Sequence, residues 1–172
     1  MKNENLPYNW YAIRVKSRSE KKVLSDLIDQ DIEAYLPITR KLRQWSDRKK
    51  WVEIPLISGY VFVHISRKEY EVVLRTFNVV CYIYFEGKAA IIRDEDINIL
   101  KRMLGQVEVE VEVTHDQLKP GQLVEIISGP LIGMIGELLE FHGKNKVALR
   151  IQPLGYTVLV ESPGQNLRPY HT

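Results

Sequence analysis

The side chains that most often carry out catalysis form no recognisable constellation in this sequence of 172 residues. The four histidines are scattered, and none pairs with Cys81 or a carboxylate at the spacing of a metal-ligand set. The sequence contains no Gly-x-Ser-x-Gly or His-Glu-x-x-His motif. Asp94, Glu95 and Asp96 are consecutive acids, but a helix N-terminus favours acids without any metal. The sequence therefore predicts a protein that is not an enzyme and has no cofactor and no metal site.

Positive charge is concentrated near the start of the chain, although the net charge is only +2. Residues 1–60 hold 12 Lys and Arg against 8 Asp and Glu. Such stretches attract phosphates, but a solvated surface is the commoner explanation, so both interpretations stay open. The second stretch also contains Trp45 and Trp51, rings of the kind on which unpaired bases stack. The two stretches consist of Arg14, Lys16, Arg18, Lys21 and Lys22, and of Arg40, Lys41, Arg43, Arg48, Lys49 and Lys50.

The composition is that of a globular protein with a buried core, with 45% apolar and 27% charged residues. Cys81 lies in the apolar run Val79–Phe85 and is expected to be a small core residue; a single cysteine excludes an internal disulfide. Residues 1–7 are polar, and no apolar run approaches the roughly 18 residues of a membrane span. We expect a cytoplasmic protein without a membrane partner.

Residues 9–105 mix strand and helix patterns without strict β-α-β alternation, which predicts an α+β sandwich of antiparallel sheet and helices. Ser17 to Glu20 form a capping box before a helix that continues to about Gln30. A second short helix is expected over 67–75, with Phe77 on its apolar side, and a third from Asp94 to Gly105. The expected strands are Asn9–Val15, Ala34–Arg43, Trp51–Ile54, Gly59–Ile65, Val79–Phe85 and Lys88–Ile92.

The last third of the chain has short strand patterns, turn residues and no helix pattern, which predicts a small all-β barrel. Before it, Val107–Val113 alternates valine and glutamate; this is either an edge strand or a tether, and we predict a linker over 107–117. Gly133 and Gly136 indicate a bulge or a sharp bend. The expected strands are Leu123–Ile127, Met134–Phe141, Lys146–Ile151 and Tyr156–Val160.

Both parts resemble the NusG family. Trp10-Tyr11 on the first strand, Glu-Lys-Lys-Val at 20–23 and Gly-Tyr-Val-Phe-Val at 59–63 are similar to its N-terminal (NGN) domain. Gly-Gln-Leu-Val-Glu-Ile from Gly121, followed by Gly129-Pro130 and Gly136, is similar to a KOW module. The resemblance covers about residues 9–168. It implies an NGN domain over 9–106, a linker over 107–117 and a KOW domain over 118–172.

A narrower resemblance lies in the block Leu42–Leu56. This block is similar to specialised paralogues called UpxY, which are antiterminators of capsular polysaccharide operons. Ser58 departs from the general family motif, in which proline is usual. The departure is an argument against a housekeeping NusG.

The resemblance implies three contact surfaces. Members of the family hold the clamp helices of the largest RNA polymerase subunit in an apolar depression on the NGN domain. Among the residues that match the lining of this depression, Phe62 is the weaker candidate, because it could instead be a core residue. RfaH-like relatives contact the displaced non-template DNA strand after the first strand, and the loop Arg43–Trp51 offers further contacts to that strand or to nascent RNA; a solvated hairpin with Trp51 half-buried is the alternative. The KOW loop meets protein partners such as ribosomal protein S10 or Rho, and an exposed Leu131-Ile132 pair would be its docking patch. The candidate residues are Tyr11, Leu56, Ile57, Tyr60 and Phe62 for the polymerase, Lys16, Arg18, Arg43, Trp45, Arg48, Lys49 and Lys50 for nucleic acid, and Gly129, Pro130, Leu131 and Ile132 for the KOW partner.

The resemblance implies a transcription elongation factor that acts as a processive antiterminator of a polysaccharide operon. It is expected to be a monomer that stabilises one polymerase conformation by binding. The alternatives are a general NusG that acts on all genes and a ribosome-associated KOW protein that binds RNA.

Overall fold

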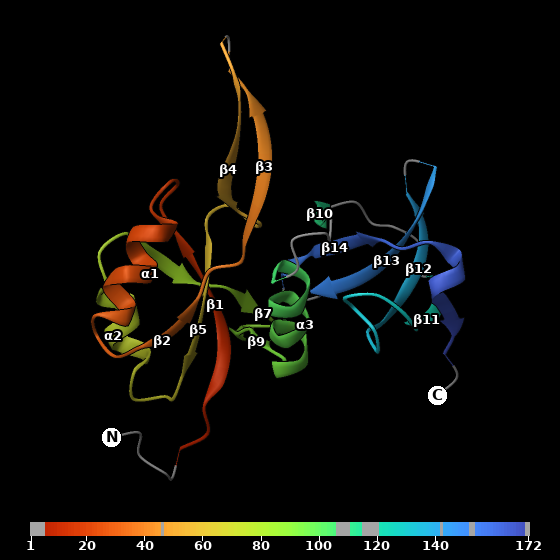
Figure 1. Cartoon of the computed structure of the whole chain (residues 1–172). Coiled ribbons are helices and arrows are strands. Elements are labelled where there is room, and N and C mark those ends of the chain that lie inside the picture. The colour runs from red at the N-terminus through yellow and green to blue at the C-terminus, as the bar shows by residue number, and fades with distance from the viewer. Residues whose placement is uncertain are drawn as a thin grey trace. The chain divides into compact units, whose positions relative to one another are not determined.

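The chain forms two compact units, residues 1–94 and 95–172. The computed structural model shown in Figure 1 describes residues 6–45, 47–105, 111–114, 121–141, 143–151 and 154–170. The division assigns the third helix to the second unit, whereas the predicted linker lies at 107–117. The predicted domain boundaries therefore stay a prediction.

The first unit is built on an antiparallel sheet with the strand order β2-β5-β1-β6, in which β9 also pairs with β1. Two separate hairpins, β3–β4 and β7–β8, accompany the sheet. Its elements are β1 (Asn9–Val15), α1 (Glu20–Ile28), β2 (Glu33–Tyr35), β3 (Ile38–Gln44), β4 (Lys49–Pro55), β5 (Tyr60–Ile65), α2 (Tyr70–Arg75), β6 (Val79–Tyr82), β7 (Tyr84–Phe85), β8 (Lys88–Ala89) and β9 (Ile91–Ile92).

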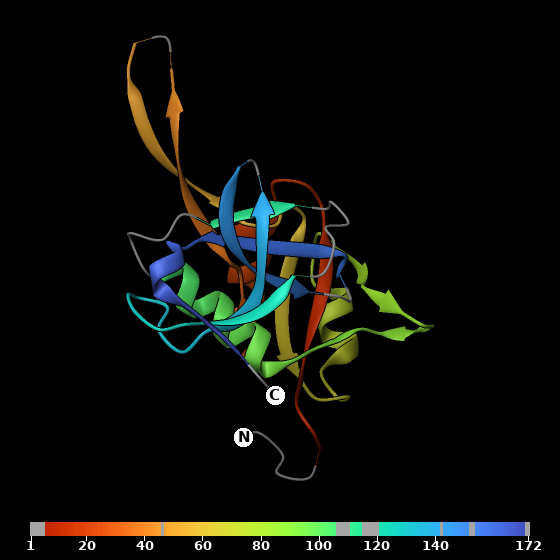
Figure 2. The same cartoon turned by 90° about the vertical axis from the view of Figure 1, so that its right-hand side faces the viewer.

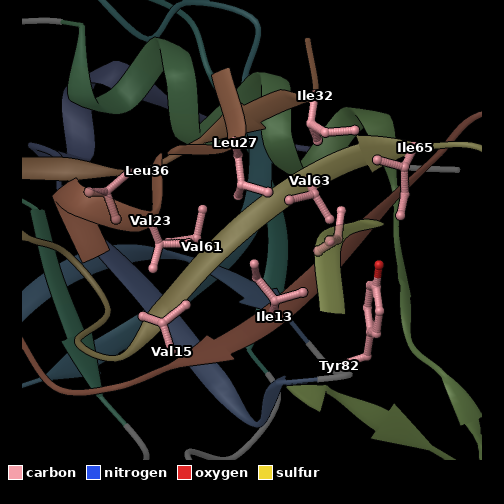
Figure 3. Close-up of a cluster of buried hydrophobic side chains, with 11 residues drawn as sticks. Ile13, Val15, Val23, Leu27, Ile32, Leu36, Val61, Val63, Ile65 and Tyr82 are labelled. Carbon is pink, nitrogen blue, oxygen red and sulfur yellow. The ribbon is translucent and has the colours of Figure 1, made fainter. Parts of the chain in front are cut away.

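The main core of this unit lies between one face of the sheet and the helices α1 and α2. Alternate residues of β1 and β5 enter it, because successive side chains of a strand point to opposite faces. Helix α1 contributes Val23 and Leu27, and α2 contributes Val73. Figure 3 shows these aliphatic side chains from strand and helix pointing toward one another. The cluster consists of Ile13, Val15, Val23, Leu27, Ile32, Leu36, Val61, Val63, Ile65, Val73 and Tyr82.

Helix α1 begins differently from the predicted capping box. Its N-cap is Ser19, which makes no side-chain hydrogen bond to the helix. The carboxylate of Glu20 instead accepts a hydrogen bond of 2.8 Å from the backbone N–H of Gly59. Glu20 is buried, and Gly59 has a φ of +82°, a conformation that favours glycine. Glu20 therefore holds the turn that leads into β5.

The predicted strand Ala34–Arg43 is two strands, because Leu36 and Pro37 separate β2 from β3. Proline has no N–H to donate to a sheet, so the chain leaves the central sheet at this point. Strand β3 then pairs only with β4, from Ile38 opposite Pro55 to Gln44 opposite Lys49. Figures 1 and 2 show this long hairpin extending away from the rest of the first unit. The hairpin β3–β4 is thus a projecting element.

The second unit contains an antiparallel sheet with the strand order β10-β14-β13-β12-β11-β15. The helix α3 buries Ile97, Leu100 and Met103. Mixed helices and antiparallel sheets confirm the predicted α+β class, while closure into a barrel stays a prediction. The elements are α3 (Asp94–Leu104), β10 (Val111–Thr114), β11 (Gln122–Ile126), β12 (Ile135–Phe141), β13 (Lys144–Ile151), β14 (Tyr156–Glu161), the 3-10 turn η2 (Gly164–Asn166) and β15 (Leu167–Pro169).

Strand pairing in this unit bears on the interpretation of residues 107–113 and on the role of Gly136. Residues 111–114 form the edge strand β10 on β14, which favours the strand over the tether; residues 107–110 and 115–117 lie outside the described residues. Gly136 lies within β12, where an added Cβ would stand 2.7 Å from Cγ1 of Val147 and 2.8 Å from the Ala148 carbonyl oxygen. This glycine permits a close approach of β12 and β13.

Candidate functional site

Of the five residues predicted to line one apolar depression, the three that belong to the central sheet lie on two different faces of it. Tyr60 is opposite Arg14 and Phe62 is opposite Ala12 in the β1–β5 register. These residues share one face, because directly paired residues in antiparallel strands point to the same side. Tyr11 belongs to the alternate set and packs against the helix-covered core. Tyr11 and Tyr60 therefore do not line one depression, which corrects the expectation for Tyr11.

Tyr11 belongs to a tyrosine cluster beside α2. The rings of Tyr70 and Tyr82 stack with centroids 3.9 Å apart, and Tyr11 presents an edge to each of them, at 6.2 and 5.9 Å. The hydroxyl of Tyr82 donates a hydrogen bond to the backbone carbonyl of Tyr70 at 3.0 Å. Burial raises the pKa of Tyr70 and of Tyr82, so these phenols stay neutral at physiological pH. The cluster packs against the helix-covered core of the unit.

The other predicted apolar residues gather around the start of β5. Phe62 is fully buried and stacks on Tyr35 with centroids 6.4 Å apart, so Phe62 is a core residue. Burial also raises the pKa of Tyr35 to about 12. Ile57 is only 2% exposed, while Leu56 and Tyr60 are half-buried. Leu56 and Tyr60 are thus the members of the predicted set whose side chains are partly exposed near the start of β5.

Arg14 is a neighbour of this group that the sequence analysis assigned only to a positive stretch. It is exposed and stands opposite Tyr60 in the register, on the same face. Alternation along β1 could have indicated its face, but the pairing with β5 was needed to place it beside Tyr60. A guanidinium beside half-buried aromatic and aliphatic side chains favours a partner surface that also carries a carboxylate.

Lys16 and Arg18 lie in the exposed turn after β1, as predicted, and Arg18 has a φ of +64°. The N–H of Lys16 donates to the carbonyl of Asn78 at 2.9 Å, and the Lys16 Nζ stands 5.7 Å from the ring centroid of Phe77. Phe77 is 73% exposed. The expectation that Phe77 lies on the apolar side of a helix is wrong, because α2 ends at Arg75 and Thr76 is extended. The structure thus places an exposed aromatic ring beside the predicted cation.

All predicted nucleic-acid residues of the second positive stretch lie on the hairpin β3–β4. Arg43, Lys49 and Lys50 are on its strands, and the N–H of Trp45 donates to the carbonyl of Arg48 at 2.8 Å near its end. Trp45 is 57% and Trp51 64% exposed. The alternative of a half-buried Trp51 is therefore wrong. Large exposed aromatic rings among cations are typical of surfaces that bind single-stranded nucleic acid.

The predicted partner loop of the second unit is only partly exposed. Gly129, Pro130 and Ile132 are exposed, the last by 57%, whereas Leu131 is 4% exposed. The guanidinium of Arg102 on α3 donates a hydrogen bond of 2.6 Å to the carbonyl of Ile132. Leu131 and Ile132 therefore do not form the exposed pair that the sequence analysis considered.

The described part of the chain presents no metal site and no membrane-spanning helix. Within it, no three His, Cys, Asp or Glu side chains gather in a way that could hold a metal ion. None of its helices has the length and apolarity needed to cross a membrane.

Comparison with known proteins identifies the family. A family model described as "Transcription termination factor nusG" matches residues 8–101, which contain β1, α1 and the hairpin β3–β4. The chain is 25% identical over 166 residues to transcription termination/antitermination protein NusG of Streptococcus pyogenes, covering 88% of this chain and 90% of that protein. It is 26% identical over 168 residues to the Chlamydia pneumoniae protein of the same name, covering 90% of each.

A solved structure of NusG from Thermotoga maritima shares the fold. Its TM-score is 0.52 at 24% identity, and the match covers 96% of this chain and 98% of that one. The relatives are transcription factors rather than enzymes. Because the family model spans more than half of the sequence, the chain belongs to the NusG family of transcription factors.

Proposed function

We propose that the protein is a processive antiterminator that binds RNA polymerase and serves a polysaccharide biosynthesis operon. The observation that carries this proposal is the position of the UpxY-like block Leu42–Leu56. Most of that block lies on the projecting hairpin β3–β4, where side chains are exposed and free to differ between paralogues. A specialised sequence on an exposed element is suited to a specialised contact.

The surface around Tyr60 is the proposed contact for the clamp helices of the largest polymerase subunit. Leu56 and Tyr60 are half-buried, whereas Ile57 and Phe62 are buried. Half-buried aromatic anchors with an apolar surround are typical of binding hot spots. Arg14 adds a charge that would pair with an acidic side chain on the clamp helices.

Capture of purified core RNA polymerase by the full chain tests this contact. We expect Tyr60→Ala to weaken capture by at least about thirtyfold, the effect of losing a hot spot of about 2 kcal/mol. Tyr84→Ala is the matched control, because Tyr84 is 58% exposed on β7 and belongs to no proposed contact. Undiminished capture by a correctly folded Tyr60→Ala variant would exclude this surface.

Nucleic acid is proposed to contact the first unit at two places. One is the turn with Lys16 and Arg18, where the ring of Phe77 offers a stacking surface beside the Lys16 amine. The other is the hairpin β3–β4, which carries exposed cations and the exposed ring of Trp45. The displaced non-template strand and the nascent RNA both present phosphates and unpaired bases, which cations and aromatic rings bind together.

Transcription in vitro on a template with the operon's own leader tests antitermination. We expect fewer pauses and greater terminator read-through on this template than on one with an unrelated leader. Equal effects on both templates would indicate a general NusG. Unchanged pausing and termination, with the protein bound to polymerase, would exclude antitermination.

A further inference from the structure

The hairpin β3–β4 has two chemically different faces, because its register is continuous from Ile38–Pro55 to Gln44–Lys49. Directly paired residues share a face, and the next pair along points to the other side. One face, here called the tryptophan face, carries Arg40, Leu42, Gln44, Lys49, Trp51 and Glu53. The other, here called the cationic face, carries Thr39, Lys41, Arg43, Lys50, Val52 and Ile54.

The tryptophan face is largely neutralised and apolar at its centre. Arg40 Nη2 lies 3.3 Å from Glu53 Oε1 across the two strands. The next pair along the same face is Leu42 and Trp51, and both side chains are exposed. Besides this ion pair the face carries the cation Lys49, opposite Gln44, so its net charge is one against three on the other face, and it attracts a phosphate backbone less strongly.

The cations of the cationic face are not neutralised by carboxylates. Arg43 stands directly opposite Lys50, and Lys41 lies on the same face, two residues earlier on β3. Within the described part of the chain, none of these three cations has a carboxylate at salt-bridge distance. Like charges directly opposite each other destabilise a strand pair. A face that keeps three exposed cations together is suited to a polyanion.

The end of the hairpin continues this face. The N–H of Trp45 donates to the carbonyl of Arg48, one pair beyond Gln44–Lys49. By alternation, Trp45 and Arg48 fall on the side of Arg43 and Lys50. An exposed ring therefore follows the row of cations, as a base-stacking surface follows a phosphate-binding groove.

We propose that the cationic face alone binds the nucleic acid, with Lys41, Arg43 and Lys50 on the phosphates and Trp45 on a base, while Trp51 takes no part. This assignment rests on the proposed nucleic-acid contact of the hairpin and specifies its side. The ligand class is single-stranded DNA or RNA, since a stacking ring needs an unpaired base.

Two charge-matched variants of the full chain test the assignment. Arg43→Gln with Lys50→Gln removes two positive charges from the cationic face, and Arg40→Gln with Lys49→Gln removes two from the tryptophan face. Binding of fluorescent single-stranded DNA and RNA oligonucleotides is measured by anisotropy over a range of salt concentrations. Each lost phosphate contact lowers the slope of log K against log salt by about 0.7 for a single strand, so the first variant should lose about 1.4 and the second close to none.

The tryptophans provide a readout that does not depend on charge. We expect Trp45→Ala to weaken binding at least about fivefold, because stacking on one base is worth about that factor or more. Trp51→Ala should leave the affinity unchanged, although Trp51 is the more exposed ring. Circular dichroism confirms that both variants are folded.

Each result supports or overturns the assignment. A smaller slope for the Arg43 and Lys50 variant alone, with loss of binding only for Trp45→Ala, supports it. Equal losses from both charge pairs, an unchanged slope for Arg43 and Lys50, or no binding by the unaltered chain overturns it. Capture of RNA polymerase is measured separately, so a failed assignment of the face is distinguished from a failed antiterminator proposal.

Discussion

Glu20 shows how a single residue connects a local motif to the proposed contact surface. Its carboxylate accepts the N–H of Gly59, in the turn between Ile57 and Tyr60. Ser17 and Glu20 have the spacing of a capping box, but Glu20 bonds to a residue 39 positions away. A buried N–H without an acceptor costs more than the bond itself contributes, so the turn depends on this side chain.

We therefore expect Glu20→Ala to lower the free energy of unfolding of the first unit by about 1–3 kcal/mol. Glu20→Gln keeps an oxygen acceptor and should lose less. Urea unfolding of the full chain followed by tryptophan fluorescence measures both variants. Equal losses would mean that the negative charge, rather than the acceptor, holds the turn.

Phe77 is the residue whose role changes most between sequence and structure. Its ring is exposed beside the Lys16 amine instead of buried along a helix. We expect Phe77→Ala to weaken single-stranded DNA binding by about five- to 150-fold, since stacking is worth about 1–3 kcal/mol per base. Phe85→Ala, at 52% exposure on β7, is the control and should bind normally. Similar losses for the two variants, measured by anisotropy, would remove Phe77 from the contact.

At the scale of the element, the same two cations of the hairpin β3–β4 are expected to lower its stability and to strengthen nucleic-acid binding. Arg43 and Lys50 repel each other across the strands. Lys50→Glu replaces this repulsion with attraction and should stabilise the hairpin by roughly 0.2–1 kcal/mol. The same change should weaken nucleic-acid binding. A melting curve and an anisotropy titration on one preparation test the two directions together; a variant that binds as well as the original chain contradicts the expectation.

Strands β12 and β13 of the second unit are joined by an ion pair that responds to pH. Arg150 donates from Nε and Nη2 to the Glu137 carboxylate at 2.9 and 3.0 Å, and the Gly121 N–H donates at 3.1 Å. The hydrogen bond from Arg150, with that from Gly121, holds the pKa of Glu137 below its ordinary value of 4.5. A lowered folded-state pKa stabilises the unit above that ordinary value, and this stability is lost as the pH falls through the folded-state pKa.

Glu137→Gln should therefore lower stability at pH 7 by about 1–3 kcal/mol, because it removes a partly buried, charge-assisted pair. The difference from the unaltered chain should shrink as the pH falls below 4.5. Urea unfolding monitored by circular dichroism at several pH values measures this difference. A difference that stays constant into acid would show that the charge on Glu137 is irrelevant.

At the scale of the whole molecule, positive charge is concentrated in the first unit. Residues 1–60 have an excess of four positive charges, whereas two exposed cations of the second unit are paired with carboxylates, Lys144 with Glu161 at 2.8 Å and Arg168 with Glu125 at 2.6 Å. Paired cations release few counterions when a phosphate approaches. The distribution of charge, rather than the net charge of +2, is therefore the basis for proposing that the first unit binds nucleic acid.

We expect Lys144→Gln with Arg168→Gln to leave the salt dependence of nucleic-acid binding unchanged. The cost in stability should stay near 0–1 kcal/mol per pair, because both pairs are at the surface. The anisotropy assay designed for the hairpin variants measures this, with Arg43→Gln and Lys50→Gln as the positive comparison. A smaller slope in the second-unit variant would mean that this unit also binds phosphates.

The amino-acid sequence by itself determined the class of the fold and several of its elements. Strands such as Asn9–Val15 and Gly59–Ile65 follow from local composition and turn residues, and the mixed order of elements predicted α+β. The exposed, basic character of the stretch around Lys49 also followed from sequence, because no apolar alternation there could bury it.

Only the tertiary structure decided which side chains meet. Alternation divides β1 into two sets but does not say which set the helices cover, and the pairing of β1 with β5 places Arg14, not Tyr11, beside Tyr60. The acceptor for Gly59 and the exposure of Phe77 likewise depend on segments distant in sequence. The physical reason is that strand periodicity is a local property, whereas register and burial come from contacts between segments far apart in the chain.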